Sequence, residues 1–444
     1  MVLDKQIVIK KTPFFLLTAI FFVFLAYSYI SIGFYQHDEV AHYLNAKNFW
    51  INPFDILGYW ERPGFKLLYV LPVLIGVKAV HITSIIISVL TCYFAYLSAK
   101  KYDLENNYIT IIFCAFQPLF MQLSFRMYSE VLASLLVSLM LLSYLHGRYW
   151  TVALTSSFLF AVRQEFAVIS LILLMFFLFR KEWLAIFLLA TTPVILGVLG
   201  WLKTGNQMWL LNIYIPIGQY RETFKPGFFH YWKMFEPFAG TAITSLFIVG
   251  FLSGFINFKT RFKQHISKYH AIYIIFISIF LFQCLFTSEF ISSPSPGWLR
   301  YLIPLTPVIA VFSNIGVNEL LSTNRISRKH SISIIVLFIV AAFFFISKKH
   351  NYLGFTDHDD YTKVAVISII LVLFFIYYNF NAISKNIVIF VLSSIVVIHA
   401  FLTEKPILLN AEDKTLNEIV KWYKENSLDD RTTLINHTLF SRQI

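Results

Sequence analysis

The stretch from Tyr35 to Lys66, YQHDEVAHYLNAKNFWINPFDILGYWERPGFK, decides how the rest of the chain is interpreted. It follows the first long apolar run and carries two adjacent acids, Asp38 and Glu39, where that run ends. Arg62 and Lys66 close the stretch. Charged side chains at the edge of a membrane are costly and usually have a function. We therefore expect this loop to cover an active site that other unusual charges of the chain help to form.

The composition is that of an integral membrane protein. Of the 444 residues, 58% are hydrophobic and 14% are charged, with a mean hydropathy of +0.68, whereas a soluble domain carries about 25% charged residues. The net charge of +12 does not indicate nucleic acid, because the basic residues gather in short loops between apolar runs. Cys92, Cys114 and Cys284 all lie inside apolar runs, so they are predicted to be small buried hydrophobes rather than a disulfide or metal framework.

The apolar runs predict an all-α polytopic protein. About 20 apolar residues cross a bilayer core of about 30 Å, which gives about thirteen transmembrane helices on this scale. The first is interpreted as an uncleaved span, because its apolar run is too long for a signal-peptide core. The predicted spans are Thr12–Gly33, Val80–Ser98, Tyr108–Leu123, Tyr128–Leu145, Tyr149–Val162, Glu165–Phe179, Trp183–Trp201, Gly240–Phe258, Ala271–Ser288, Leu299–Leu320, Ser331–Ile346, Thr362–Tyr378 and Asn386–Phe401.

Basic loops orient these spans. With a cytoplasmic N-terminus, most of the short basic loops fall on the inside, and Lys348-Lys349 is the exception. The outside then receives the stretch Tyr35–Lys66, with an interfacial helix over Gly64–Val77, and the aromatic-rich loop Lys203–Pro237. We predict a transmembrane module with catalytic outer loops at 1–258, a second transmembrane module at 259–402 and a short outer tail at 403–444. Within the tail, helical spacing over Leu416–Tyr423 predicts an amphipathic helix, followed by a strand over Thr432–Thr438.

The His37-Asp38-Glu39 triplet is suited to proton transfer. A carboxylate where a helix leaves the lipid can serve as a general base, because partial burial raises its pKa while outer water stays close. If a helix begins here, Asp38 and His42 share one face and Glu39 points elsewhere. The plain alternative is that Asp38 only caps the helix.

Three later segments carry further charges at predicted outer helix ends. Arg126 and Glu130 are four residues apart, which also suits an ordinary ion pair on one helix. Arg163 and Glu165 are two apart, so they cannot face each other on a regular helix, and each alternatively caps a separate short helix. Arg300 begins the tenth span, where a single arginine alternatively extends its head group to the interface.

These charges share one predicted location. A charge at mid-bilayer costs about 2.5–3.5 kcal/mol on the insertion scale, so charges at the membrane are expected to be used. Arginines beside carboxylates describe a site that holds a phosphate and moves a proton. The predicted topology places the following residues at one membrane face: His37, Asp38, Glu39, Arg62, Lys66, Arg126, Glu130, Arg163, Glu165 and Arg300.

Five segments carry a resemblance to a known family. They are HDEVAHYLNAKNFW (37–50), RPGFKLLYVLP (62–72), RMYSEVLASLL (126–136), RQE (163–165) and GWLRYLIPLTP (297–307). Their layout resembles the GT-C superfamily of polytopic glycosyltransferases, which includes dolichyl-phosphate-mannose-dependent mannosyltransferases, protein O-mannosyltransferases and the lipid A aminoarabinose transferase. The resemblance covers the first seven spans and, more loosely, the remainder.

The resemblance implies a transferase of glycan biosynthesis. The expected donor is a polyprenyl-phosphate-linked sugar, with mannose favoured, and the acceptor is a glycan, lipid or protein at the periplasmic face of a bacterial inner membrane. Transfer inverts the anomeric carbon, with Asp38 as base and Glu39 as its catalytic neighbour. The implied donor-phosphate ligands are Arg62, Lys66, Arg163 and Arg300, and the implied substrate contacts are His37, His42, Arg126, Glu130 and Glu165.

Several alternatives stay open on the sequence. No cofactor is required by a single-base mechanism, although a divalent metal at Asp38 is compatible with the paired acids. The run Asp357-His358-Asp359-Asp360 is predicted to be a solvated loop tip rather than a metal site. A transporter or flippase of a lipid-linked sugar or another anionic lipid is the main alternative function, but such proteins tend to place ionisable groups near the midplane. A ligase-type enzyme acting on a lipid pyrophosphate is a second alternative.

Overall fold

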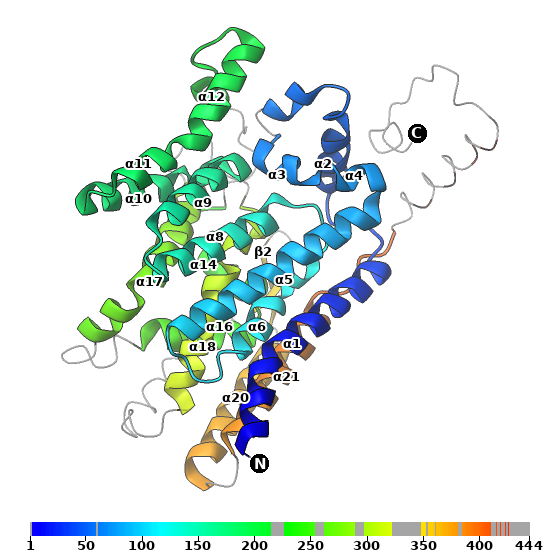
Figure 1. The fold of residues 1–444 in the computed structure, drawn as a ribbon. Coiled ribbons are helices and arrows are strands. Elements are labelled where there is room, and N and C mark those ends of the chain that lie inside the picture. Colours follow the sequence, from blue (N-terminus) through cyan, green and yellow to red (C-terminus); the bar gives the residue numbers. More distant parts are fainter. Residues whose placement is uncertain are drawn as a thin grey trace.

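The computed structural model describes residues 2–58, 61–214, 226–253, 262–288, 297–321, 348–351, 354–359, 361–380 and 384–409, with four single residues of the tail. The predicted span Ser331–Ile346 and the two predicted tail elements lie outside these ranges. Within them the protein is a bundle of helices with short helices gathered at one end (Figure 1). We call this end, where α2 (His37–Asn48) and α3 (Pro63–Tyr69) lie, the site end.

The first part of the bundle contains long apolar helices and several shorter helices that follow one another closely. Its helices are α1 (Val2–Ile30), α5 (Val77–Lys101), α6 (Ile109–Ala115), α7 (Pro118–Leu123), α8 (Ser129–Leu145), α9 (Tyr149–Val162), η2 (Gln164–Phe166), α10 (Ala167–Arg180), α11 (Trp183–Leu189), α12 (Thr191–Thr204) and α13 (Trp209–Tyr214). Pro118 divides the predicted span Tyr108–Leu123 into α6 and α7, because proline lacks the N–H that would continue the helix.

The loop at the site end is built from four short helices. Besides α2 and α3 it contains η1 (Pro53–Leu57) and α4 (Pro72–Ile75). The prediction of one interfacial helix over Gly64–Val77 is wrong, because α3 ends before Pro72 and α4 starts with it. Gly64 lets α3 approach α9 closely, since a Cβ there would stand 2.8 Å from Cβ of Ala161. This contact brings the start of α3 beside the end of α9.

The second part of the bundle packs directly on the first. Its elements are α14 (His230–Lys233), α15 (Phe235–Ala239), α16 (Thr241–Leu252), α17 (Phe262–Phe286), η3 (Leu299–Leu305), α18 (Thr306–Leu321), β1 (Lys348–Asn351), β2 (Gly354–Asp359), α20 (Tyr361–Phe380) and α21 (Lys385–Thr403). α18 contacts α5 and α6 as well as α16. The predicted module boundary at 258/259 falls outside the described residues.

Two glycines make the closest helix contact. Added Cβ atoms at Gly250 of α16 and Gly316 of α18 would stand 1.9 Å from the carbonyl oxygen of Phe312 and 2.1 Å from that of Leu246. Small residues of this kind let membrane helices pack backbone to backbone. The buried core therefore runs through α16 and α18, and it continues into α5, α6 and α8, where Cys92 and Cys114 lie buried and unpaired as predicted.

The helical membrane architecture is confirmed. In the described part of the chain, six segments are long and apolar enough to cross a membrane: Thr12–Ile30, Val77–Lys101, Trp183–Thr204, Lys263–Phe286, Leu299–Leu321 and Lys385–Thr403. Shorter apolar helices occupy the positions of other predicted spans. The total of about thirteen stays a prediction. One difference is the antiparallel pairing of β1 with β2, because Asp357, His358 and Asp359 of the predicted solvated loop tip lie in β2.

The segment 404–409 after α21 joins the first and last parts of the bundle. α1 and α21 lie side by side (Figure 1), and the hydroxyl of Tyr27 donates to the carbonyl of Glu404 at 2.9 Å. The N–H of Ile407 donates to Oγ of Ser31 at 2.9 Å, and the N–H of Gly33 donates to the carbonyl of Ile407 at 2.8 Å. Residues 404–409 therefore pack against the loop that leads from α1 to α2 at the site end.

Candidate active site

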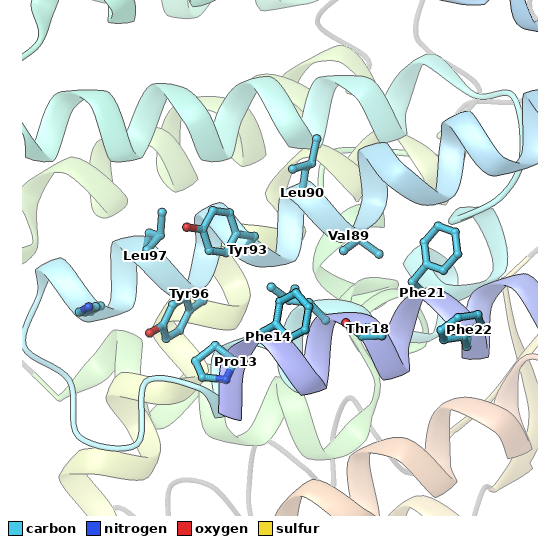
Figure 2. Close-up of a pocket in the computed structure, with 12 residues that line it drawn as sticks. Pro13, Phe14, Thr18, Phe21, Phe22, Val89, Leu90, Tyr93, Tyr96 and Leu97 are labelled. Carbon is cyan, nitrogen blue, oxygen red and sulfur yellow. The ribbon is translucent and has the colours of Figure 1, made fainter. Parts of the chain in front are cut away.

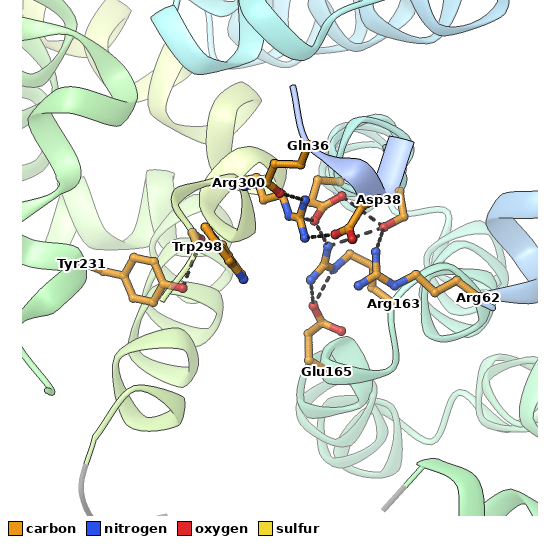
Figure 3. Close-up of polar contacts among 10 residues, drawn as sticks. Gln36, Asp38, Arg62, Arg163, Glu165, Tyr231, Trp298 and Arg300 are labelled. Atoms are coloured by element: carbon orange, nitrogen blue, oxygen red, sulfur yellow. Dashed lines mark hydrogen bonds and ion pairs between the residues drawn. The ribbon is translucent and has the colours of Figure 1, made fainter. Parts of the chain in front are cut away.

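Charges from five distant chain segments converge at the site end (Figure 3). They come from the first turn of α2, the residue before α3, the first turn of α8, the junction of α9 with η2, and η3. Helix ends place side chains at the end of the bundle, which explains why charges can lie here beside so apolar a chain. We call the following group the charge cluster: Asp38, Arg62, Ser129, Glu130, Arg163, Glu165 and Arg300.

Glu130 is at the centre of the charge cluster. Its side chain is 0% exposed. One carboxylate oxygen forms an ion pair with Nη1 of Arg163 and lies 3.3 Å from Nε of Arg300. A buried ion pair is favourable only when its charges are well matched and hydrogen-bonded. Glu130 therefore fixes the positions of two guanidinium groups that come from different parts of the chain.

Asp38 is the most exposed acid of the charge cluster. Its Oδ2 lies 2.5 Å from Nη2 of Arg300, and its side chain keeps 33% of its exposure. The neighbouring Gln36 also accepts a hydrogen bond from Arg300. Asp38 does not cap α2, since the N-cap position belongs to Gln36, which makes no side-chain cap. The carboxylate thus faces both the cluster and the solvent side.

The hydroxyl of Ser129 connects the remaining groups. It accepts from Nη1 of Arg62 at 2.6 Å and from Nη1 of Arg163 at 3.4 Å, and it donates to Glu130 at 3.1 Å. Arg62 reaches it from a left-handed backbone conformation with φ of 51°, which is uncommon for a residue with a side chain. Strained backbone of this kind persists where the surroundings hold it, often at functional sites.

Arg163 and Glu165 contact each other despite being two residues apart. The chain is extended at Arg163, and Glu165 lies in η2, so the regular-helix geometry assumed from the sequence does not apply. Burial alone would lower the pKa of Arg163, but the carboxylates of Glu130 and Glu165 raise it above its usual range. Burial and the neighbouring Arg163 lower the pKa of Arg62. The carboxylates of Glu130 and Glu165 therefore stabilise the charged form of Arg163.

Arg126 and Glu39 form a second pair behind the charge cluster. Nη1 of Arg126 lies 2.8 Å from Oε2 of Glu39, and Nη2 lies 3.0 Å from Oγ of Ser31. Both charged side chains are buried. The predicted alternative of an ion pair between Arg126 and Glu130 does not form, because α8 begins only at Ser129 and Arg126 turns toward α2.

His42 and Lys66 lie beside the charge cluster. The ring of His42 packs edge-on against those of Phe65 and Tyr128, with centroids 5.2 and 6.4 Å away. Burial lowers the pKa of His42 well below its usual range, and the charges of Arg62 and Lys66 lower it further, so the imidazole is neutral near pH 7. Lys66 is buried in an ion pair with Glu61. His37 begins α2, and its side chain lies outside the described part.

Aromatic rings hold the arginines, and the sequence analysis did not identify them. Arg163 lies over the ring of Tyr301 at 4.6 Å, and Arg300 lies near the rings of Tyr128, Trp298 and Tyr301 at 5.2, 5.8 and 5.8 Å. Such contacts favour a guanidinium that keeps its charge in an apolar place. The sequence feature that indicates these rings is their position, because each ring is within two residues of a residue of the charge cluster.

The fold has solved counterparts, although the sequence matches no protein-family profile and no curated protein. ArnT from Cupriavidus metallidurans bound to undecaprenyl phosphate superposes with a TM-score of 0.59 at 11% identity, over 98% of this chain and 84% of that one. The apo state of the same protein gives a TM-score of 0.58 at 12% identity, over 100% and 85% of the two chains. ArnT is a GT-C aminoarabinose transferase. This chain has a GT-C-like fold.

One cavity of the GT-C-like bundle lies apart from the charge cluster. It is a groove of about 750 Å³ between α1 and α5, lined by Pro13, Phe14, Tyr93, Tyr96 and other mainly apolar residues as far as Lys100 (Figure 2). No acid lines it, and in a bilayer such a groove faces lipid. The chemistry that the charges permit therefore belongs to the site end.

A metal receives no support from the described residues. Among them, no group of three His, Cys, Asp or Glu side chains is placed to hold a metal ion. Asp38 is bound to Arg300, and Glu39 is bound to Arg126, so the two adjacent acids face different partners. The side chains of 357–360 lie outside the described part. The charge cluster is instead suited to bind an anion and to accept a proton.

Proposed function

We propose that the protein is a glycosyltransferase that moves a sugar from a polyprenyl-phosphate carrier to an acceptor at the outer face of the membrane. The observation that carries this proposal is the convergence of three guanidinium groups, those of Arg62, Arg163 and Arg300, beside the partly exposed carboxylate of Asp38. Guanidinium groups suit phosphate oxygens, and a carboxylate suits proton transfer. The GT-C-like fold supports the proposal, because ArnT is similar in fold and was solved with undecaprenyl phosphate bound.

In this proposal Asp38 acts as general base. It accepts the proton of an acceptor hydroxyl while the hydroxyl oxygen forms a bond to the anomeric carbon, on the side opposite the phosphate, so that the configuration inverts. The bond between the anomeric carbon and the phosphate oxygen breaks, and the polyprenyl phosphate leaves with the electron pair. Arg300 and Arg62 stabilise the charge that develops on this oxygen, a kind of contact whose loss costs about 10²–10³-fold in rate.

The residues around Asp38, Arg62 and Arg300 have proposed roles that range from phosphate binding to positioning. Arg163 is the third proposed phosphate ligand, held by Glu130 and Glu165. Glu39 is buried in an ion pair with Arg126. This pair therefore positions α2 and does not contact the sugar directly. His37 and His42 stay proposed substrate contacts. Lys66 reaches a phosphate only if its ammonium leaves Glu61, so it is the weakest of the four proposed phosphate ligands.

The sugar, the acceptor and the membrane face are proposed from the family resemblance. Mannose is the proposed sugar, and a glycan, lipid or protein is the proposed acceptor. The proposed location of the site is the periplasmic face of a bacterial inner membrane. A carrier lipid exposes its phosphate at headgroup level, and the charge cluster lies at the end of the helix bundle, where headgroups are found. This match favours a lipid-linked donor over a nucleotide sugar, which is cytoplasmic.

Sugar transfer by the purified protein tests the proposal. Protein in detergent is incubated with radiolabelled polyprenyl-phosphate mannose and a membrane extract that lacks the enzyme. Wild type is compared with Asp38→Asn and with Asp55→Asn, which removes an exposed acid of the same loop whose side chain accepts a hydrogen bond from Asn52. We expect transfer by wild type and Asp55→Asn and none by Asp38→Asn. Absence of transfer from mannose, glucose and aminoarabinose carriers, with movement of the lipid across liposomes, would instead establish the transporter alternative.

A further inference from the structure

The contacts of Arg300 point to a step beyond phosphate binding. We propose that Arg300 exchanges its partner Asp38 for the phosphate of the donor, so that donor binding itself releases the catalytic base. This inference rests on the proposed function. It concerns the order of events at the same site, because it makes the base available only when the donor is present.

Charge balance supplies the first argument. The charge cluster holds three guanidinium groups, Arg62, Arg163 and Arg300, and three carboxylates, Asp38, Glu130 and Glu165. The neighbouring pairs of Arg126 with Glu39 and of Lys66 with Glu61 are each neutral. A phosphate that enters this balanced group adds negative charge to a largely buried place, where unpaired charge is costly. One carboxylate must therefore leave its arginine or become protonated.

Exposure identifies the carboxylate that leaves. The side chain of Glu130 is 0% exposed and is shared by Arg163 and Arg300, so it has no path to solvent. Glu165 is 17% exposed and contacts Arg163 through both Nε and Nη2. Asp38 is 33% exposed and contacts Arg300 through a single nitrogen, Nη2. Because a carboxylate that moves into water regains its hydration, Asp38 is the group with the smallest cost of release.

Arg300 itself is held in place. Its Nε lies 3.3 Å from Glu130, and its guanidinium lies beside the rings of Tyr128, Trp298 and Tyr301. Only the two terminal nitrogens face α2, and they are occupied by Asp38 and Gln36 (Figure 3). Two parallel N–H groups in this arrangement match two oxygens of one phosphate. The exchange therefore moves the start of α2 and leaves the arginine where it is.

The exchange links binding to chemistry in both directions. Without donor, the carboxylate of Asp38 is neutralised by Arg300 and is a poor base. With donor bound, it is free to take the proton of the acceptor hydroxyl. After transfer Asp38 is protonated and cannot compete for Arg300. Once it loses the proton to solvent, it returns to Arg300 and displaces the polyprenyl phosphate.

Equilibrium binding of radiolabelled undecaprenyl phosphate tests the exchange directly. Wild type, Asp38→Asn, Arg300→Lys and the double variant Asp38→Asn/Arg300→Lys are compared in detergent, with Asp55→Asn as the charge-matched control. Size-exclusion profiles and thermal unfolding confirm that each variant is folded. Inorganic phosphate is added as a competitor in a parallel series, which distinguishes a site for free phosphate from one for the lipid-linked ester.

The exchange predicts an unusual result, tighter binding by an inactive variant. Asp38→Asn should bind about tenfold more tightly, because close charge pairs at an interface are commonly worth more than 1.4 kcal/mol, which corresponds to tenfold. Asp55→Asn should bind as wild type does. In the Arg300→Lys background the gain from Asp38→Asn should largely disappear, since the competition occurs at the guanidinium.

Each other outcome has a distinct meaning. Equal or weaker binding by Asp38→Asn overturns the exchange, as does a gain of the same size in the Arg300→Lys background, which would reflect general charge removal. Displacement of the lipid by inorganic phosphate at equal concentration would assign the site to free phosphate and overturn it as well. Wild type that transfers sugar but shows no gain in Asp38→Asn refutes the exchange alone, whereas wild type that neither binds the lipid nor transfers sugar refutes the proposed function.

Discussion

Two groups of buried charges in the described part of the protein differ in how far they are shielded from solvent. In the second part of the bundle, Lys363 of α20 lies 2.6 Å from Glu236 of α15, and both side chains are less than a tenth exposed. Thr241 donates to the same carboxylate at 2.5 Å, and its hydroxyl oxygen lies 3.3 Å from Nε2 of His399 on α21. In the charge cluster, Asp38 keeps a third of its exposure, and one acid is shared by two arginines.

This difference separates a structural ion pair from a candidate active site. The pair of Lys363 and Glu236 joins α15 and α20, and both of its side chains are shielded from solvent. The charge cluster has a partly exposed acid, Asp38, at one side and the buried arginines Arg163 and Arg300 at the other. A buried pair of the first kind is sensitive to loss of either partner. A cluster of the second kind should lose activity before it loses the fold.

Replacement of Asp38 by Asn should produce the largest effect on activity. Loss of a general base lowers the rate by about 10²–10⁴-fold, while the thermal unfolding temperature in detergent should stay close to that of wild type because Asp38 is partly exposed. Initial rates of sugar transfer measure the loss. An unfolding temperature reduced as strongly as the rate would make Asp38 a structural residue and would remove the contrast between the two groups.

Glu236→Gln should produce the largest effect on stability. Breaking a buried ion pair costs about 3–5 kcal/mol, because the remaining charge stays buried after it loses this contact. Thermal unfolding in detergent detects the loss, and sugar transfer per folded molecule should keep its KM. The double variant Glu236→Leu/Lys363→Met removes both charges and should recover most of the stability. Failure of the double variant to recover it would mean that the pair has a role beyond joining helices.

Glu130→Gln should weaken donor use without unfolding the bundle. Hydrogen bonds to charged groups contribute about 1.5–3 kcal/mol, so kcat/KM should fall by about 10–150-fold. Glu165→Gln should have a smaller effect, because Glu165 is partly exposed and contacts only Arg163 within the charge cluster. Steady-state kinetics on the polyprenyl-phosphate sugar measure both. The opposite order of the two effects would show that Glu130 is not central.

Gly64→Val tests the contact that places Arg62. A side chain at this position would strike Ala161, and overpacking of this kind costs about 1–3 kcal/mol. Because α3 would be pushed from α9, affinity for polyprenyl phosphate should fall together with stability. Gly197→Ala on α12 is the matched control, since nothing lies within 4 Å of an added Cβ there, and it should leave both properties unchanged.

Ser31→Ala should have the smallest effect. The variant removes the hydroxyl that binds both Arg126 and the N–H of Ile407, and a hydrogen bond contributes about 0.5–1.5 kcal/mol. We expect a small loss of thermal stability and a transfer rate reduced a few-fold. Ser28→Ala is the control, because the Ser28 hydroxyl only donates to the nearby carbonyl of Leu25. Equal effects of the two variants would show that the contact with 404–409 does not support the site.

Hydrophobic runs predicted the fold class, and charge positions predicted residues that the structure brings together at the site end, but the pairing of the charges was beyond the sequence. Arg126 and Glu130 are one helical turn apart in sequence, yet the extended backbone at Tyr128 delays the start of α8 and separates them. Arg163 and Glu165 meet because the chain is extended at Arg163. Pairing depends on backbone angles at helix ends and on which ends meet, and neither is encoded in local periodicity.

Other details were visible in the sequence and were missed. Pro72 lies in the middle of the predicted interfacial helix Gly64–Val77, and Pro118 lies inside the predicted third span. Both prolines mark helix starts in the structure, as their missing N–H requires. Trp298 and Tyr301 lie within two residues of Arg300 in sequence, and Tyr128 precedes Ser129. Their role depends on stacking across segments, which no spacing rule indicates.

The contact between 404–409 and the loop after α1 has a consequence for biosynthesis. A nascent chain emerges and inserts from its N-terminus, so Asp38 and Glu39 leave the ribosome early, while the segment 404–409 that contacts Ser31 and Gly33 arrives only after α21. The first loop is therefore completed by nearly the last described residues of the chain. A product that ends before Glu404 contains the helices up to α21 but lacks the segment that contacts Ser31 and Gly33, so we expect it to lose sugar transfer.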